Sequence, residues 1–391
     1  MTTPTIARGT SIELVGLDGS NPLGFLCAVG TLVCLRGAGQ HDARLRWAFA
    51  HTGKPVIDGV TRSDPEWLCE TLAQELSGQV VTEEAEEKRI VLEREFEQAK
   101  SAVQTKAKEI RDRKLRGDER QRAVDEELTP LLIARDEVRR RWLSALQAAV
   151  PRAELALGKS IDCTEAEFRE YAEEIVRASG VGARDTCDLL AAFGSDACLK
   201  LNLDRVQPTP FCFITGAGHQ FFLDTARKLM ERVSVEKLQE ALFRPWLYVD
   251  ETLSMRWDPI EDRRYALMDR DPTAADNKAR TVWMANLLAY RALVLFATSP
   301  TVRGLGTTAW GQDANGPFFA WPLWEASLSP AGIRSLLQLQ ELVDPELGTS
   351  NRVRATLRAR GIAHVFRSYR IRTPPSGANY RVNFSPAVRV M

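Results

Sequence analysis

Alternating and continuous apolar stretches predict that the chain opens as a strand, a turn, a helix and a second strand. Residues 11–17 alternate between apolar and polar side chains, as a half-buried strand does. Residues 23–35 are apolar on nearly every face, which predicts a buried helix that is too short to cross a bilayer. Residues 44–49 alternate again, so we expect a second strand whose polar face carries Arg44 and Arg46.

Two glycines inside the first predicted helix indicate that another part of the molecule approaches it closely. Asn21 is placed to cap this helix, and Pro22 suits its first position. Gly24 and Gly30 then fall in the helix interior, where glycine costs about 1 kcal/mol relative to alanine. Either a packed element or a ligand explains them, and close packing is the simpler explanation.

A long charged region in the first half of the chain has the pattern of a helical hairpin. Apolar residues recur at intervals of three and four within 92–110 and again within 128–145. A polar break at 115–119 separates the two stretches, so we expect two antiparallel helices with a narrow apolar seam. Thr129 and Pro130 are expected to cap and restart the second helix. Most of the charges on the other faces are expected to be solvated.

Further elements are predicted beyond the hairpin. Thr164 and Glu167 have the spacing of a capping box at the start of a helix over 164–178. Residues 211–215 are expected to form a strand, followed by a glycine turn at 216–220 and a helix over 221–233. That order exposes backbone N–H groups at a helix start, which suits an anion. We also expect a buried helix over 279–298, a strand over 318–323 and a helix over 333–342.

The predicted fold class is therefore α+β and helix-rich, with a mixed core and an inserted antiparallel coiled-coil helical hairpin. The expected organisation has four parts: an N-terminal αβ segment of the core (1–81), the hairpin (82–150), a helix-rich core (151–346) and an arginine-rich, β-hairpin-like C-terminal segment (347–391).

Composition adds that the protein is expected to be cytoplasmic, without a membrane partner. Hydrophobic residues make up 44% and charged residues 27%, as is usual for a globular protein. The seven cysteines include no C-x-x-C pair, which favours reduced thiols. Residues 1–10 do not have the pattern of a signal peptide.

The C-terminal segment carries the strongest functional signal. Residues 347–391 contain nine arginines and no Lys, Asp or Glu, although the whole chain has a formal net charge of zero. Aromatic residues such as Phe366 and Tyr369 are interleaved with them. Guanidinium groups beside aromatic rings suit phosphates and stacked bases. Two interpretations remain open, since the arginines either contact nucleic acid or pair with acids elsewhere in the fold.

His219 is the histidine of most interest, because it follows the glycines of the predicted helix start. It either caps or packs in the core, contacts a phosphate or base, or acts in catalysis. The expected nucleic-acid contacts are Arg44, Arg46, His219, Gln220, Arg303, Arg352, Arg354, Arg358, Arg360, Arg367, Arg370, Arg372 and Arg381.

An alternative chemistry is a metal-dependent nuclease or phosphohydrolase. It would use His41, His51, Asp258 and Asp262, but the chain has only four histidines, and arginines alternate with the acids near 258–271. Internal ion pairs explain that acidic cluster more simply, so neither a metal nor a catalytic residue is expected. A phosphate-binding loop ending at Ser160 would need a glycine where Ala153 stands, so no nucleotide cofactor is expected.

Four short stretches resemble proteins encoded beside type I-G (formerly I-U) CRISPR effector complexes. They are residues 14–32 (LVGLDGSNPLGFLCAVGTL), 216–220 (GAGHQ), 256–265 (RWDPIEDRRY) and 303–308 (RGLGTT). None of them is a catalytic signature.

This resemblance implies a noncatalytic subunit of an RNA-guided antiviral complex, similar to its large subunit or an accessory protein. Such a subunit would help recognise the motif flanking the target DNA, hold the displaced strand, and contact guide RNA, other effector subunits and a helicase-nuclease. A third interpretation is a protein-interaction scaffold that works through the helical hairpin.

Overall fold

The structure is a computed structural model in which two compact units are distinguished. One unit comprises Met1–Gly78 with Lys159–Met391, and the other comprises Gln79–Gly158. The residues described are 10–49, 53–178, 184–201, 203–214, 216, 220–260, 280–373 and 381–391.

The larger unit opens with a three-stranded antiparallel sheet. Its strands are β1 (Thr10–Glu13), β2 (Arg44–Ala48) and β3 (Lys54–Val60), in the order β1-β3-β2. The prediction of a strand over 11–17 was too long at its end. The chain turns after Glu13, where the Leu17 N–H donates to the Leu14 carbonyl at 3.0 Å.

Helix α1 (Pro22–Gly37) is buried against α11 (Trp283–Ala292). The Asn21 side chain caps α1, as predicted, by accepting from the Leu23 N–H at 2.8 Å. A Cβ atom built at Gly30 would lie 1.7 Å from the Leu288 carbonyl oxygen. Close packing of two helices therefore explains this glycine, as expected.

The other helices that were predicted in this unit differ from the observed ones mainly at their ends, and four of the observed helices, in 65–77, 184–193, 235–243 and 351–359, were not predicted. Thr164 and Glu167 form the predicted capping box, with bonds of 3.2 Å and 2.8 Å. The buried helix expected over 279–298 is shorter: α11 ends at Ala292 and a 3-10 turn, Leu293–Leu295, follows. The remaining helices are α2 (Pro65–Ser77), α6 (Glu165–Ala178), α7 (Arg184–Phe193), α8 (Phe222–Met230), α9 (Val235–Phe243), α12 (Pro330–Leu337) and α13 (Asn351–Ala359), with 3-10 turns at Gln340–Leu342 and Pro345–Gly348.

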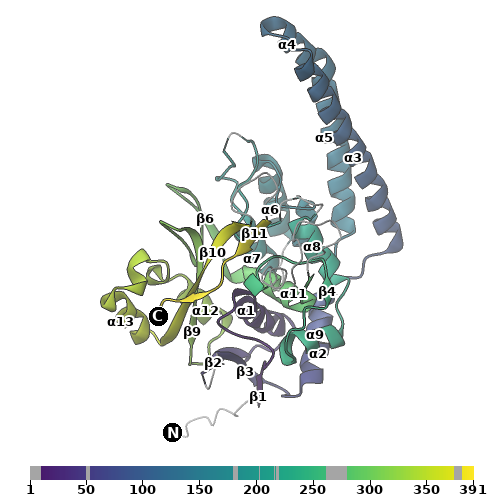
Figure 1. Cartoon of the computed structure of the whole chain (residues 1–391). Helices are drawn as coiled ribbons and strands as arrows, with labels where there is room; N and C mark the ends of the chain where they lie inside the picture. The colour runs from purple at the N-terminus through teal and green to yellow at the C-terminus, as the bar shows by residue number, and fades with distance from the viewer. Residues whose placement is uncertain are drawn as a thin grey trace. The chain divides into compact units, whose positions relative to one another are not determined.

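A five-stranded antiparallel sheet holds the C-terminal segment. Figure 1 shows β10 between β9 and β11. Trp321, on β9, donates its indole N–H to the Gly19 carbonyl at 2.8 Å and stacks on Phe366 of β10. The predicted strand over 318–323 is confirmed within β9. The strands are β8 (Trp310–Asp313), β9 (Gly316–Trp324), β10 (Ile362–Thr373), β11 (Arg381–Phe384) and β12 (Val388–Arg389); the two-stranded sheets pair β4 (Asp250–Glu251) with β5 (Arg280–Thr281) and β6 (Thr298–Thr301) with β7 (Gly304–Thr307).

The strand predicted over 211–215 was wrong for residues 211–214, and Thr215 lies outside the described residues. The Phe211 ring is fully buried and packs edge-on against Trp257 and Phe319. Its carbonyl accepts from the Trp257 indole N–H at 2.9 Å, so a side chain takes the place of a strand partner. The apolar run reflects aromatic packing rather than strand pairing.

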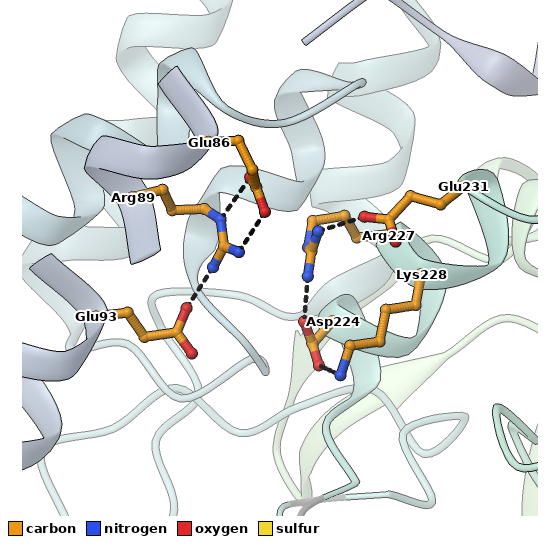
Figure 2. A network of polar contacts seen from close by, with 7 residues as sticks. All are labelled: Glu86, Arg89, Glu93, Asp224, Arg227, Lys228 and Glu231. Atoms are coloured by element: carbon orange, nitrogen blue, oxygen red, sulfur yellow. Dashed lines mark hydrogen bonds and ion pairs between the residues drawn. The ribbon is translucent and has the colours of Figure 1, made fainter. Parts of the chain in front are cut away.

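The second unit is a helical hairpin. Figure 1 shows α3 (Glu83–Asp112) and α5 (Thr129–Ala148) side by side, with α4 (Gly117–Ala123) at the tip. Phe96 and Trp142 stack between the two long helices, with ring centroids 5.2 Å apart. Within α3, Arg89 forms ion pairs with Glu86 and Glu93 (Figure 2). A 3-10 turn, Ala153–Leu157, follows the hairpin.

The restart expected at Thr129 takes another form. A π-helical segment, Val124–Leu128, leads into α5, and Thr129 has helical backbone angles. The Thr129 hydroxyl donates to the Val124 carbonyl at 3.2 Å instead of capping the helix. Pro130 has no backbone N–H to donate to the preceding turn. The π-helical segment, whose hydrogen bonds join residues five apart, accommodates this missing donor.

Candidate nucleic-acid interface

Helix α13 presents two arginines on its solvent face. Ser350 caps the helix by accepting from the Val353 N–H at 3.4 Å. On its inner face Leu357 is fully buried in an apolar cluster with Leu347 and Val365. Arg352 and Arg358 are exposed, and their guanidinium groups form no hydrogen bond or ion pair with residues that the structure describes. This face is therefore available for an anion.

The other two arginines of this region are held locally. Arg354 donates to the Asn351 side chain at 3.0 Å and to the Thr349 carbonyl at 3.3 Å. Arg360 is exposed but lies 3.5 Å from the carboxylate of Glu341. Both interactions are partly solvent-exposed and weak, so these arginines are secondary candidates.

Arg367 is a correction to the expected set of nucleic-acid contacts. It is only 4% exposed, donates to the Leu342 carbonyl at 3.2 Å and bonds to the Asp344 carbonyl. Its guanidinium carbon lies 4.3 Å from the centre of the Phe318 ring. Burial lowers the pKa of Arg367 from its ordinary value. These contacts tie β10 to the preceding 3-10 turns, so the folded chain does not present Arg367 to a phosphate.

Three further arginines lie on β10 and β11. Arg370 is half-buried, with its guanidinium carbon 5.5 Å from the centre of the Phe213 ring. Arg372 is exposed near the end of β10, and Arg381 is half-buried opposite Thr373 on the neighbouring strand. They stay candidates for contact.

Both arginines of strand β2 are engaged within the fold. The Arg46 Nε lies 2.9 Å from a carboxylate oxygen of Asp58. Arg44 donates to the carbonyls of His41 and Ala43, at 3.1 Å and 2.9 Å. Both side chains therefore already have partners within the fold, and nucleic-acid contact by Arg44 and Arg46 stays a prediction.

The helix start after the glycine turn is not an open anion site. The N–H groups of Leu223 and Asp224, in the first turn of α8, both donate to the Lys159 carbonyl at 3.0 Å. The Asp224 carboxylate places a negative charge there and pairs with Arg227 and Lys228 (Figure 2). Anion binding is disfavoured here, because the N–H donors are occupied and the Asp224 carboxylate repels a second negative charge.

Other residues expected around this turn are placed only in part. Gln220 accepts from the Arg256 guanidinium at 2.8 Å through its side-chain oxygen, and its carbonyl accepts from the Gly216 N–H at 2.8 Å. His219 lies outside the described residues. Arg303 is exposed at the turn between β6 and β7, and its guanidinium has no bonded partner within the described ranges.

A cavity of about 490 Å³ lies where three distant segments of the chain meet. The loop 16–22 forms one wall, residues from 246–260 form a second, and Phe366 and Arg389 belong to a third. Two of the stretches that carry the family resemblance, 14–32 and 256–265, therefore contribute residues to the same hollow.

Asp258 joins the first two walls of the cavity. One of its carboxylate oxygens accepts from the Asn21 side chain and from the Ile260 N–H, both at 2.9 Å. The other accepts from the Tyr248 hydroxyl at 2.7 Å. Asp258 is 2% exposed, and burial raises the pKa of its carboxyl, an effect that these three donors offset in part. Its role in the fold is to fix the cavity's walls.

The metal-dependent alternative receives no support from the described residues. Among them, no group of three or more His, Cys, Asp and Glu side chains is arranged to hold a metal ion. Asp258 already accepts three hydrogen bonds, and His41 is exposed. His51 and Asp262 lie outside the described residues.

None of the residues that line the cavity belongs to the sequence-based set of nucleic-acid contacts; Trp246, Tyr248 and Arg389 are examples. Arg389 belongs to the C-terminal arginines, so its composition signal was present. Trp246 and Tyr248 lie in a stretch without a recognisable motif, and only folding brings them beside the loop 16–22. No pattern within a single segment could have identified them.

Comparisons with known proteins add no family. A scan of the chain against protein-family models finds no match, and a search among curated proteins finds none either. Separately, none of the helices that the structure describes combines the length and apolar character needed to cross a membrane. None of the seven cysteines forms a disulfide.

Proposed function

We propose that this protein is a noncatalytic nucleic-acid-binding subunit of an RNA-guided surveillance complex of the CRISPR type I-G kind. It contacts the backbone of target DNA, guide RNA or both through arginines of its C-terminal segment. Other effector subunits and a helicase-nuclease are its protein partners. Sequence is read mainly by pairing with the guide.

The observation that carries the proposal is the outer face of α13. Arg352 and Arg358 are six residues apart, so their side chains leave the exposed surface of the helix about 120° apart around its axis and about 9 Å apart along it. Ala355 and Ala359, also exposed, leave this face uncrowded. No Asp or Glu occurs between 347 and 391, so no acid within this segment repels a phosphate there. Unpaired guanidinium groups on a rigid helix suit phosphate contact.

The resemblance to CRISPR-associated proteins supplies the cellular context. Two of its four stretches supply walls of one cavity, joined by the bond between Asn21 and Asp258. Stretches that form one site are expected to occur together in the members of a family. Their meeting at one cavity therefore supports a function shared with the CRISPR-associated proteins.

Replacing Arg352 and Arg358 together with alanine is expected to weaken nucleic-acid binding. Each phosphate contact contributes about 0.9 to the slope of log affinity against log salt on duplex DNA. Losing two contacts should therefore reduce the slope by about 1.8 and the affinity by about 30-fold near 0.15 M salt. Titrations of labelled duplex and single-stranded oligonucleotides at four salt concentrations measure both quantities.

The matched control replaces Arg120 and Arg122 of α4 with alanine. These two arginines are also exposed and form no ion pair with described residues. Their replacement removes the same amount of positive charge. We expect the control to keep the wild-type affinity and salt slope. Equal losses in the two double variants would show that only total charge matters, and an unchanged slope in Arg352→Ala/Arg358→Ala would reject the α13 interface. Loss in the control alone would transfer the function to the helical hairpin.

A further inference from the structure

We infer that the cavity bounded by the loop 16–22, residues 246–260 and the segment 366–389 binds a single unpaired guanine nucleotide of the bound nucleic acid. This inference rests on the proposed function and adds a base-reading site to it. The cavity's volume of about 490 Å³ lies in the range of small-ligand sites, which span roughly 300–1,000 Å³. A duplex cannot enter a hollow of this size, whereas one nucleotide fits.

The apolar walls suit a flat ring. Trp246 and Phe366 line the cavity together with Pro22, Pro259 and Pro386. One face of Phe366 stacks on Trp321, with centroids 5.9 Å apart and an angle of 21° between the planes. The Trp246 indole N–H donates to the Ala241 carbonyl at 2.9 Å. Both rings are held in place before a ligand arrives, and such preset aromatic surfaces stack nucleobases.

The carboxylate of Asp18 selects the kind of base. One of its oxygens accepts from the Ser20 N–H and hydroxyl, both at 2.8 Å, which orients the group. Asp18 forms no ion pair with any residue in the described part of the chain, although it lines the cavity. A carboxylate only accepts hydrogen bonds, so it prefers a base edge with adjacent donors. Guanine offers neighbouring N1–H and amino donors, whereas the corresponding edges of adenine, cytosine and uracil each include acceptors.

Arg389 supplies the opposite charge in the same cavity. Phe366 and Arg389 face each other across β10 and β12, so their side chains lie on one side of the sheet. The neighbouring Val390 packs on the other side, in the apolar cluster under α13. Arg389 is exposed and forms no ion pair with Asp18 or with other residues that the structure describes. A cavity with a separate carboxylate and guanidinium suits a ligand that carries donors at one end and a phosphate at the other.

The remaining polar groups of the cavity are committed to the fold. Asn21 uses its oxygen to cap α1 and its amide to bond Asp258, and the Tyr248 hydroxyl bonds Asp258 as well. Recognition therefore depends on Asp18, Ser20 and Arg389 rather than on these groups.

Binding of the four ribonucleoside 5′-monophosphates to the full chain tests this site, followed by the fluorescence of Trp246 and its neighbours and by calorimetry. GMP is expected to bind at least tenfold more tightly than AMP, CMP or UMP. Asp18→Asn keeps an oxygen for Ser20 but turns the acceptor into a mixed group, so it should abolish this preference. Arg389→Ala should weaken GMP at least fivefold while leaving guanosine, which has no phosphate, unchanged.

Two controls separate this inference from the proposed function. Arg120→Ala/Arg122→Ala should bind GMP like the wild type, and thermal melting checks that Asp18→Asn is folded. Trp246→Leu provides a second variant, which is expected to weaken the binding of all four nucleotides through lost stacking.

The outcomes distinguish the two proposals. If Arg352→Ala/Arg358→Ala weakens oligonucleotide binding but the protein shows no preference for GMP, the proposed function stands and the guanine site is rejected. If GMP binds as expected but oligonucleotides do not bind at all, the proposed function falls instead. Tighter binding of a proline-rich peptide than of GMP in this cavity, lost in Trp246→Leu, would also overturn the guanine assignment.

Discussion

Gly30→Ala is expected to destabilise the protein by more than about 3 kcal/mol, beyond the usual cost of an overpacked core. The added Cβ would lie 1.7 Å from the Leu288 carbonyl oxygen and 3.2 Å from the Ala292 nitrogen. Both neighbours are backbone atoms of α11, so no side-chain rotation can relieve the overlap. The helices must separate, although both α1 and α11 are buried along nearly their whole length.

Chemical denaturation monitored by circular dichroism measures this loss. The matched control is Gly332→Ala in α12, where the new Cβ would find its nearest atom, on Leu328, at an ordinary 3.6 Å. Alanine favours a helix over glycine by about 0.5–1 kcal/mol, so the control should be neutral or slightly more stable. A Gly30→Ala protein as stable as the control would mean that α1 and α11 do not pack as the structure shows.

Local signals in the sequence were sufficient where a few neighbouring residues determine the structure. Asn21 before Pro22 predicted the start of α1, and Thr164 with Glu167 predicted a capping box, because these bonds span only two or three residues. The glycine spacing of α1 also predicted a close neighbour, though not which helix it would be. The α+β, helix-rich fold class followed from the same patterns.

Signals failed where the deciding contact comes from far along the chain. The run at 211–214 looks like a strand, but its packing partners, Trp257 and Phe319, are 46 and more residues away. Arg352 and Arg367 are indistinguishable by composition. One is exposed on α13, whereas the other is buried under carbonyls of the preceding turns. The exposure and the bonding partners of an arginine side chain depend on tertiary structure, and a count of charges does not reveal them.

The candidate site illustrates the same limit. Asp18, Trp246 and Arg389 come from the two ends and the middle of the chain, and the cavity exists only after folding joins them. The resemblance to CRISPR-associated proteins singled out the stretches 14–32 and 256–265 without indicating that they meet. The two stretches meet at Asp258, which the sequence offers as a possible metal ligand because other acids lie near it. The sequence does not reveal that Asn21, Tyr248 and Ile260 donate hydrogen bonds to this carboxylate.

Asp258→Ala is therefore expected to cost about 3 kcal/mol of unfolding free energy. It removes three hydrogen bonds at once and leaves the donors of Asn21, Tyr248 and Ile260 unsatisfied. An unsatisfied buried donor costs about 1–3 kcal/mol, and access of water from the cavity lowers the total for the three. Denaturant titration measures the loss. GMP binding should fall with it, since Asn21 and Tyr248 line the cavity.

The Asp258→Asn variant tests the electrostatic part of the same argument. Burial raises the pKa of Asp258 above its ordinary value of 3.8, so the folded protein binds a proton that the unfolded chain has already released. The free energy of unfolding contributed by this group therefore falls as pH rises from about 3.8 through the folded pKa. Asparagine does not titrate, so its stability relative to the wild type should improve as pH increases over that range. A relative stability that is flat as pH rises above 3.8, or that moves in the opposite direction, would show that the three donors balance or outweigh burial and hold Asp258 ionised.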